Sequence, residues 1–259
     1  MHALIILAQP EPQSTNARLA RCAAESFRAR GASVELSYLY AMGFDPVEGP
    51  RHYPSRADAG YFDAQREQRG AYELAATPPD VQLEIEKLQR ADVVLIQFPL
   101  WWWGPPAILK GWFDRVLIYG GLYSSGRRLE RGPLAGRKAM LSVTLGASPG
   151  ACEHNGHDGD IQLVLWPVLI TLRYVGLSVL PPLLVPGVHT SRDPAAGEAL
   201  AARLDAAERE LAARIAQIET LPELAFNTLE DFDPNSRLKP DAQAHTPFIR
   251  HRAKLDLGP

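Results

Sequence analysis

Apolar segments of strand length alternate with segments of helical periodicity along this chain, and that alternation limits its possible folds more than any other feature. Residues 3–8 (ALIILA) are continuously apolar, as expected of a parallel strand that is covered on both faces. Ser14 then offers a helix N-cap, and apolar residues recur at helical spacing up to Gly31. A second strand is predicted at 33–39. This opening therefore predicts a βαβ unit.

The same pattern continues through most of the chain. Further strands are predicted at 92–97, 138–144 and 178–185. One helix is predicted to begin at Pro79, two more to span 106–118 and 161–175, and the last to end near Ile218. Five strands alternating with helices predict an α/β fold with a doubly wound parallel sheet and helices on both faces. An insertion at 41–78, rich in Pro, Gly, Tyr and Arg, has a short helical pattern at 64–74. Its length favours a functional role.

Composition indicates a folded protein that acts on small molecules. The 259 residues are 46% hydrophobic, which is enough for one domain with an appendage. The net charge of -3 disfavours a nucleic-acid partner. No run approaches the roughly 18 apolar residues of a membrane span, and the first residues lack the basic leader of a signal peptide. We therefore expect a cytoplasmic protein without an integral membrane segment.

An aromatic turn at Trp101–Trp103 joins the third strand to a Pro-led helix, within Ile96–Leu117. In open α/β sheets, ligands bind beyond the carboxyl ends of the strands, where this turn lies. Three consecutive indoles cannot all face one core, because neighbouring side chains point in different directions. We expect at least one of them to face a cleft, with core packing beside a proline turn as the alternative.

The first strand ends in a second candidate site. Ala8–Asn16 (AQPEPQSTN) places free backbone amides and short hydroxyls at a helix N-terminus, which favours anions. The segment matches neither the dinucleotide fingerprint nor the phosphate loop of nucleotide triphosphatases. A purely structural cap remains the alternative.

The strand ends taken together resemble the flavodoxin-like NAD(P)H:quinone oxidoreductase family. The matching segments are QPEPQSTN, LYAMGFDP, QFPLWWWGPPAILKGWFDRV and SVTLGASPG followed by DGD, and they extend in order over about residues 2–215. The resemblance implies a flavodoxin-like five-stranded sheet of order 2-1-3-4-5 and a homodimeric flavoenzyme. It also implies that NAD(P)H gives a hydride to bound FAD, or less often FMN, and that a quinone-like acceptor then takes it in a ping-pong reaction.

By resemblance, particular residues surround the flavin. Those implied to hold its phosphates are Ser14, Thr15 and Asn16, with Gln9 where animal relatives carry a histidine. Those implied to back the ring are Pro99, Leu100, Trp102 and Trp103, with Trp101 in a neighbouring, more variable place. Those implied to meet its polar edge are Thr144, Leu145, Gly146 and Ala147. Residues 1–218 are then the flavin-binding domain, and 219–259 an extended tail over the body or over a partner subunit.

The implied catalytic residues depart from the family pattern. Tyr123 matches a substrate-contacting tyrosine, whereas Ser125 replaces a second one. Cys152 and Asp158 stand where animal quinone reductases carry a tyrosine and a histidine that stabilise the reduced flavin. His157 lies one residue earlier and takes that role if the loop shifts by one position; otherwise it is an exposed loop histidine. The spacing of Cys152, His154, His157 and Asp158 matches no standard zinc motif, so no metal is expected.

Three functions follow from the sequence. The first is an NAD(P)H dehydrogenase that reduces quinones by two electrons. A general flavin, azo or nitro reductase is the nearest alternative, because the same pocket supports it. Some relatives instead serve as ancillary subunits of potassium-efflux transporters, for which the tail at 219–259 is a candidate docking element. NADH versus NADPH and the physiological acceptor stay open.

Overall fold

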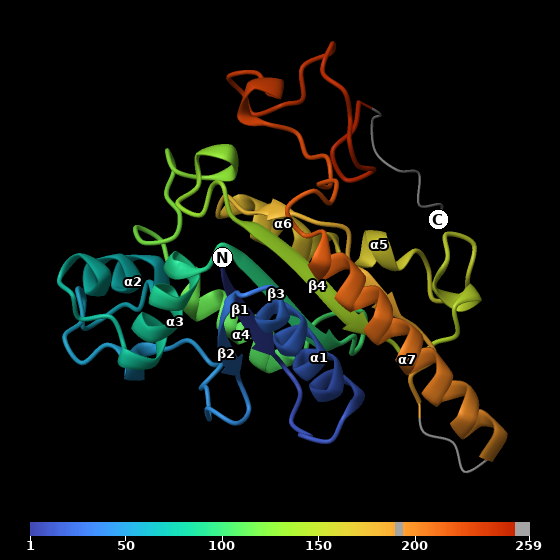
Figure 1. Ribbon diagram of the computed structural model, residues 1–259. Coiled ribbons are helices and arrows are strands. Elements are labelled where there is room, and N and C mark those ends of the chain that lie inside the picture. Colours follow the sequence, from blue (N-terminus) through green and yellow to red (C-terminus); the bar gives the residue numbers. More distant parts are fainter. Residues whose placement is uncertain (190–193, 252–259) are drawn as a thin grey trace.

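The computed structural model describes residues 1–189 and 194–251, which form one parallel sheet between two layers of helices (Figure 1). The strands are β1 (His2–Leu7), β2 (Ser33–Tyr38), β3 (Val93–Pro99), β4 (Lys138–Thr144), β5 (Ser178–Val179) and β6 (Leu183–Val185). Their order is β2-β1-β3-β4-β5, and β6 pairs with the later part of β4. The sheet order that the resemblance implied is confirmed.

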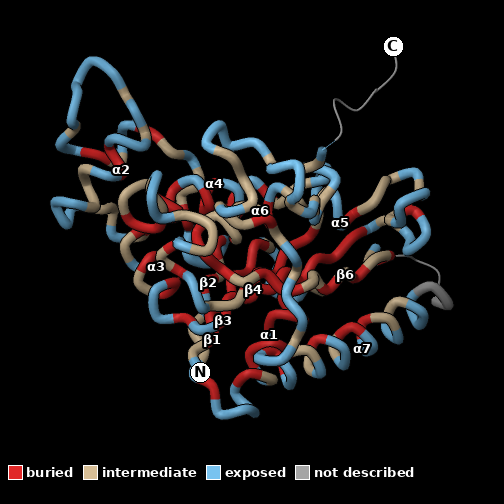
Figure 2. Tube along the Cα trace, turned by 90° about the horizontal axis from the view of Figure 1, so that it is seen from above, coloured by how far each residue is buried: buried red, intermediate tan, exposed pale blue. Residues whose placement is uncertain are grey.

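Helices cover both faces of this sheet. The α-helices are α1 (Thr15–Ala29), α2 (Ala64–Glu73), α3 (Pro79–Arg90), α4 (Ala107–Val116), α5 (Ile161–Val164), α6 (Trp166–Tyr174) and α7 (Pro194–Ala216). Short 3-10 turns lie at Pro50–His52, Leu129–Arg131, Gly150–Cys152 and Leu229–Asp231. Helices α1 and α7 pack on one face, and α3, α4 and α6 pack on the other (Figures 1 and 2).

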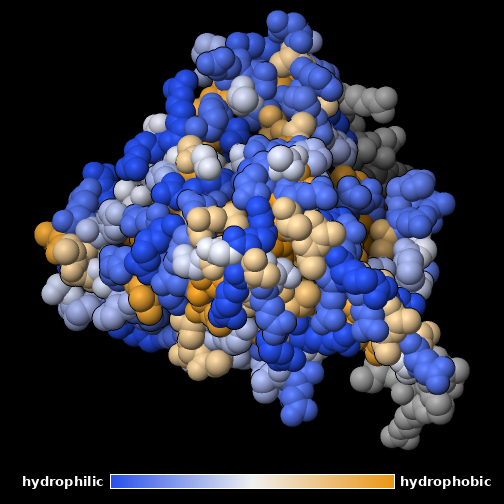
Figure 3. Space-filling model, in the orientation of Figure 1, coloured by the Kyte–Doolittle hydropathy of each residue, from blue (hydrophilic) through white to orange (hydrophobic). Residues whose placement is uncertain are grey.

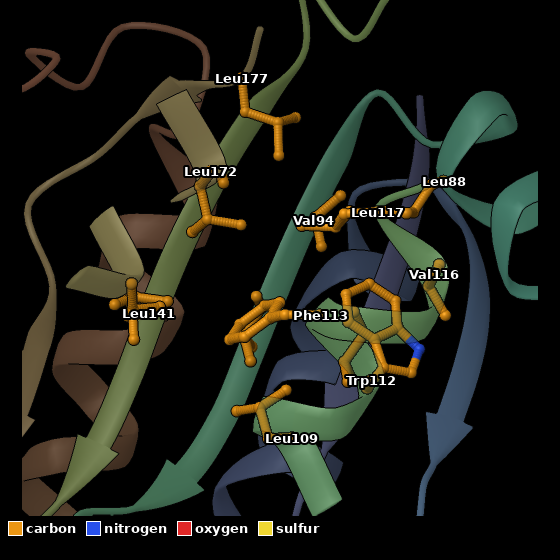
Figure 4. Packing of buried hydrophobic residues seen from close by; sticks show 14 of the residues in the cluster. Leu88, Val94, Leu109, Trp112, Phe113, Val116, Leu117, Leu141, Leu172 and Leu177 are labelled. Carbon is orange, nitrogen blue, oxygen red and sulfur yellow. The ribbon is translucent and has the colours of Figure 1, made fainter. Parts of the chain in front are cut away.

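Each face of the sheet has its own apolar core. Leu19 and Phe27 of α1 pack with Leu211 of α7 on one face. On the other face, Trp112 and Phe113 of α4 lie against the strands (Figure 4). Burial on both sides explains why the central strands are continuously apolar. The outer surface in Figure 3 is mostly hydrophilic, with apolar residues in small patches.

Two sequence predictions were wrong where prolines interrupt the chain. The strand predicted at 178–185 is divided into β5 and β6, because Pro181 and Pro182 have no N–H to donate to the neighbouring strand. The helix predicted at 161–175 is divided into α5 and α6, with Pro167 in the first turn of α6. A proline there cannot complete the i to i−4 hydrogen bond of a continuous helix. Apolar periodicity alone did not show either break.

The described part of the tail, 219–251, forms a lobe against α6 that is coloured orange to red in Figure 1. The rings of Phe226 and Phe248 stack on the Trp166 indole, with centroid separations of 5.6 and 5.3 Å. The Leu224 N–H also donates to the Val179 carbonyl at 2.8 Å. The tail predicted at 219–259 thus contacts its own chain as far as it is described, and residues 252–259 lie outside the described residues. Within the two described ranges, no helix is both long and apolar enough to cross a bilayer.

Candidate active site

A cleft of about 280 Å³ opens beyond the carboxyl ends of β3 and β4. Its lining residues come from the aromatic turn, the loop after β4 and the segment before α5: Leu100, Trp102, Trp103, Leu145, Gly146, Ala147, Asp158 and Ile161. All but Ile161 were singled out from the sequence. The fold therefore brings together most of the ring-backing and ring-edge residues that the resemblance implied, whereas Pro99, Trp101 and Thr144 are outside the lining.

The aromatic turn holds its indoles out of the core. Trp101 and Gly104 exchange two backbone hydrogen bonds, at 2.9 and 3.0 Å. Between them, Trp102 and Trp103 have φ angles of +51° and +55°, a left-handed conformation that costs about 1–2 kcal/mol per residue without glycine. Trp102 is 91% exposed and Trp103 52% exposed. The alternative of ordinary core packing is therefore wrong, and the expectation that an indole faces a cleft is confirmed.

The loop after β4 presents backbone donors to the cleft. The Leu145 and Ala147 carbonyls accept from the N–H groups of Val188 and Gly187, at 2.8 and 2.6 Å. The Gly146 carbonyl lies 3.3 Å from His189 Nδ1. With these carbonyls engaged by the segment after β6, the N–H groups of Gly146 and Ala147 have no partner among the described residues. Two free donors at a strand end stabilise negative charge on a ligand.

A second pair of free donors lies at the start of α1. The Ser14 hydroxyl caps the helix by accepting from the Ala17 N–H at 3.2 Å. The N–H groups of Thr15 and Asn16 have no partner in the described parts of the chain, as an anion site requires. The Asn16 side chain itself is buried and bonded to Gln97 and Thr144, so only its backbone is available to a phosphate. Gln9, at the end of β1, is partly exposed.

The loop before α5 brings Asp158, rather than His157, to the cleft. The Trp103 Nε1–H donates to the Asp158 carbonyl at 2.9 Å. His157 is directed away, with its side chain 82% exposed and its Nδ1 2.9 Å from the Asp158 carboxylate. A Cβ on Gly156 would lie 2.3 Å from the Ala151 carbonyl, so this tight turn requires glycine. His157 is therefore not among the residues that line the cleft.

Cys152 is half-buried just before this turn and does not line the cleft. Burial raises the pKa of its thiol, so the thiolate is less accessible than in an exposed cysteine. No group of three or more His, Cys, Asp or Glu residues among the described ones could hold a metal ion.

Tyr123 lies in a larger, mainly apolar groove of about 980 Å³ between α2, α4 and α6. Its hydroxyl accepts from Gln65 Nε2 at 3.0 Å, and its ring packs edge-on against Tyr119 and Tyr174. Burial raises the pKa of the Tyr123 phenol. Trp103 lines both the cleft and the groove, so the two are adjacent. Tyr123 thus lies in the space next to the cleft that the other predicted site residues line.

A doubly wound sheet with an aromatic turn and unpaired backbone donors at its carboxyl edge defines an α/β protein whose candidate ligand site lies at that edge. A family model described as having a flavodoxin-like fold matches residues 1–211. This chain therefore belongs to the flavodoxin-like family.

Named relatives agree with that assignment. NAD(P)H dehydrogenase (quinone) 1 of Cavia porcellus is 39% identical over 194 residues, which are 74% of this chain and 70% of that protein. Ribosyldihydronicotinamide dehydrogenase (quinone) of Mus musculus is 37% identical over 73% of this chain and 83% of its own. The structure of a candidate quinone reductase from Klebsiella pneumoniae is 28% identical, with a TM-score of 0.84 and 98% of each chain covered.

Proposed function

We propose that this protein is a flavin-dependent oxidoreductase that passes a hydride from NAD(P)H to quinones or similar acceptors. The relatives described above are quinone dehydrogenases, and two of the segments that carry the family resemblance, the aromatic turn and the loop after β4, line the cleft. The observation that carries the proposal is that one cleft is lined both by exposed indoles and by two residues, Gly146 and Ala147, whose backbone N–H groups have no partner among the described residues. When bound, the flavin supplies the ring that accepts the hydride and passes it on.

The residues of the cleft and of the start of α1 fit a flavin in three respects. Trp102 and Trp103 offer aromatic surface for a planar ring, as implied also for Pro99 and Leu100. The N–H groups of Gly146 and Ala147 suit the polar edge of that ring, where they stabilise negative charge. The start of α1 suits the phosphates, with the Ser14 cap beside it. We propose FAD over FMN because the resemblance is to FAD-containing enzymes.

Asp158 takes the place proposed for the family histidine. Its carbonyl receives the Trp103 indole N–H, and its carboxylate binds His157. We propose that this pair fixes the indole against the ring, while the backbone donors of Gly146 and Ala147 carry the charge on the reduced cofactor. Cys152, which is outside the cleft lining, then contributes packing alone.

A second copy of the chain is the proposed occupant of the groove. Its lining is mainly apolar with polar side chains such as Gln65 and Lys110 among it, a composition that suits a protein partner. Because Trp103 borders both spaces, a partner in the groove would close one side of the flavin cleft and bring the acceptor near Tyr123. Light scattering of the purified protein is expected to show a dimer, and a monomer would contradict this part of the proposal.

Trp103→Ala tests the cofactor site. The variant loses one wall of the cleft, so we expect its flavin dissociation constant to rise by about tenfold or more. Purified protein is mixed with excess FAD or FMN and desalted, and retained flavin is read from its visible absorption. Trp101→Ala is the matched control, because Trp101 is half-exposed in the same turn but outside the cleft lining. Equal flavin retention by the wild type and Trp103→Ala would contradict the role assigned to Trp103. In a separate assay, the turnover rates of the wild type with quinones, azo dyes and nitroaromatics distinguish the acceptor classes.

A further inference from the structure

A chain of three buried polar side chains lies beneath the cleft, and we name it the polar relay: Gln97, Asn16 and Thr144. Gln97 Nε2 donates to Asn16 Oδ1 at 2.7 Å, and Asn16 Nδ2 donates to Thr144 Oγ1 at 2.9 Å. All three residues are buried, with at most 3% of each exposed to solvent. They come from β3, α1 and β4, the three elements that carry the parts of the candidate flavin site.

Each member of the polar relay is next to a different part of that site. Asn16 belongs to the first turn of α1, and its own N–H is one of the free anion donors. Thr144 is the residue before Leu145, where the loop with the ring-edge donors begins. Gln97 precedes the aromatic turn on β3. Because hydrogen bonds are directional, the polar relay fixes the spacing between the phosphate end and the ring end of the site.

Stability alone does not explain a glutamine at position 97. Its Oε1 is buried and has no hydrogen-bond partner among the described residues, and the same holds for Oγ of Ser142, its register partner on β4. A buried polar atom without a partner destabilises the fold. The residues on the same side of β3, Val93 and Leu95, are apolar. Local departures of this kind from good packing are expected at functional sites.

We propose that Gln97 is a positioning residue that sets flavin affinity by holding Asn16. Without the Gln97 donor, Asn16 Oδ1 keeps only the Thr144 Oγ1 contact at 3.2 Å, so the Asn16 side chain is held to one strand instead of two and the first turn of α1 is free to shift. The N–H groups of Thr15 and Asn16 then lose their fixed distance from those of Gly146 and Ala147. This inference rests on the proposed flavin function, since it assigns to Gln97 the geometry of that same site.

Gln97→Met and Gln97→Glu test the inference together. Methionine keeps the length of the side chain but cannot donate, so we expect the dissociation constants of FAD and FMN to rise by about tenfold at every pH. The melting temperature of the flavin-free protein should change little, because the substitution removes the unpaired Oε1 and Asn16 Oδ1 keeps Thr144 Oγ1 as a donor. A glutamic acid can donate to Asn16 only when protonated. Its variant should therefore bind flavin nearly as the wild type does at pH 5 and more weakly at pH 8.

Leu95→Met is the matched control, because it alters packing on the same side of the same strand without touching a hydrogen bond. Flavin affinity is measured by fluorescence titration, and stability by thermal unfolding of the same flavin-free samples. If the wild type binds flavin and Gln97→Met binds it equally well, this inference alone is overturned. It is also overturned if affinity falls only in proportion to lost stability, or if Gln97→Glu shows no more pH dependence than the wild type. A wild type that binds neither flavin would overturn both the proposed function and this inference.

Discussion

Two buried polar clusters lie on opposite faces of the sheet, and they differ in charge and in completeness. On the α3 and α4 face, we define the charged cluster as Glu84, Lys87, Ser37 and Trp112. The Glu84 carboxylate accepts from Lys87 Nζ at 2.6 Å, from Ser37 Oγ at 3.0 Å and from Trp112 Nε1 at 2.9 Å. On the α1 face, the polar relay is uncharged, and Oε1 of Gln97 is left unpaired.

Their positions explain the difference. The charged cluster joins β2, α3 and α4, and none of its residues lines the cleft or the groove. A buried carboxylate must be fully paired, and this one is held by three donors. The polar relay lies directly under the strand ends that form the cleft, where an exact spacing of backbone donors matters more than complete pairing. We infer that the charged cluster maintains the scaffold and that the polar relay maintains the ligand geometry.

The largest expected effect is that of Glu84→Ala on the charged cluster. The substitution leaves the Lys87 ammonium buried without its counter-ion and the Trp112 N–H without its acceptor, so the free energy of unfolding should fall by about 3–5 kcal/mol. Urea denaturation measures this loss, and flavin affinity of the folded protein should be unchanged. Glu86→Ala is the control, because Glu86 is exposed on the same helix and should cost under about 0.5 kcal/mol. A large loss of flavin affinity at full stability would remove the distinction between the two clusters.

Compared with Glu84→Ala, Thr144→Val is expected to lower the free energy of unfolding less and flavin affinity more. Valine keeps the shape of threonine but leaves the Asn16 amide without its acceptor, which should cost about 1–3 kcal/mol. Flavin retention should fall because the polar relay is broken at its β4 end. Ser142→Ala, on the same strand, is the control: its hydroxyl has no partner, so its removal should leave stability equal or higher. If the two variants behave alike in urea denaturation and in flavin titration, the polar relay has no positioning role.

The sequence predicted the repeating strand and helix pattern because local chemistry determines it. The Ser14 cap and the continuous apolar run of β1 indicate one helix and one strand without reference to the rest of the chain. The order of the strands depends on long-range pairing, and it came from the family resemblance. The breaks at Pro167 and Pro181 were missed because apolar periodicity was given more weight than the missing N–H groups.

The candidate site was predictable only in part. Exposed indoles and free amides follow from residue types at strand ends, and the structure brought most of them together. The choice of Asp158 over His157 depends on a tight turn that needs Gly156, and spacing alone does not reveal that turn. Gln97 was missed as a distinct residue, although a single amide inside the buried segment VVLIQFP is a readable signal. A polar residue in a strand covered on both faces needs a partner, and the partner can be found only in three dimensions.

A third polar cluster, at the amino end of the sheet, gives the smallest expected effect because it is more open to solvent than the other two. Glu35 binds Arg90 at 2.9 Å and His2 at 2.7 Å, and the Arg90 hydrogen bond followed by that of His2 lowers the pKa of its carboxyl group. A lowered folded-state pKa means that this carboxylate stabilises the protein above its unfolded pKa, near 4.3, and that the stabilisation is lost as pH falls through the folded value.

Glu35→Gln should therefore lower the free energy of unfolding by about 0.5 kcal/mol at pH 7, since solvent screens exposed pairs. The difference from the wild type should shrink as pH falls below the unfolded pKa and disappear once Glu35 is protonated in the folded protein. Urea denaturation over a series of acidic pH values measures it, and flavin retention should be unaffected. A difference that persists at low pH would mean that Glu35 acts through packing. A difference of several kcal/mol at pH 7 would contradict the view that burial makes the charged cluster and the polar relay contribute more than the Glu35 cluster.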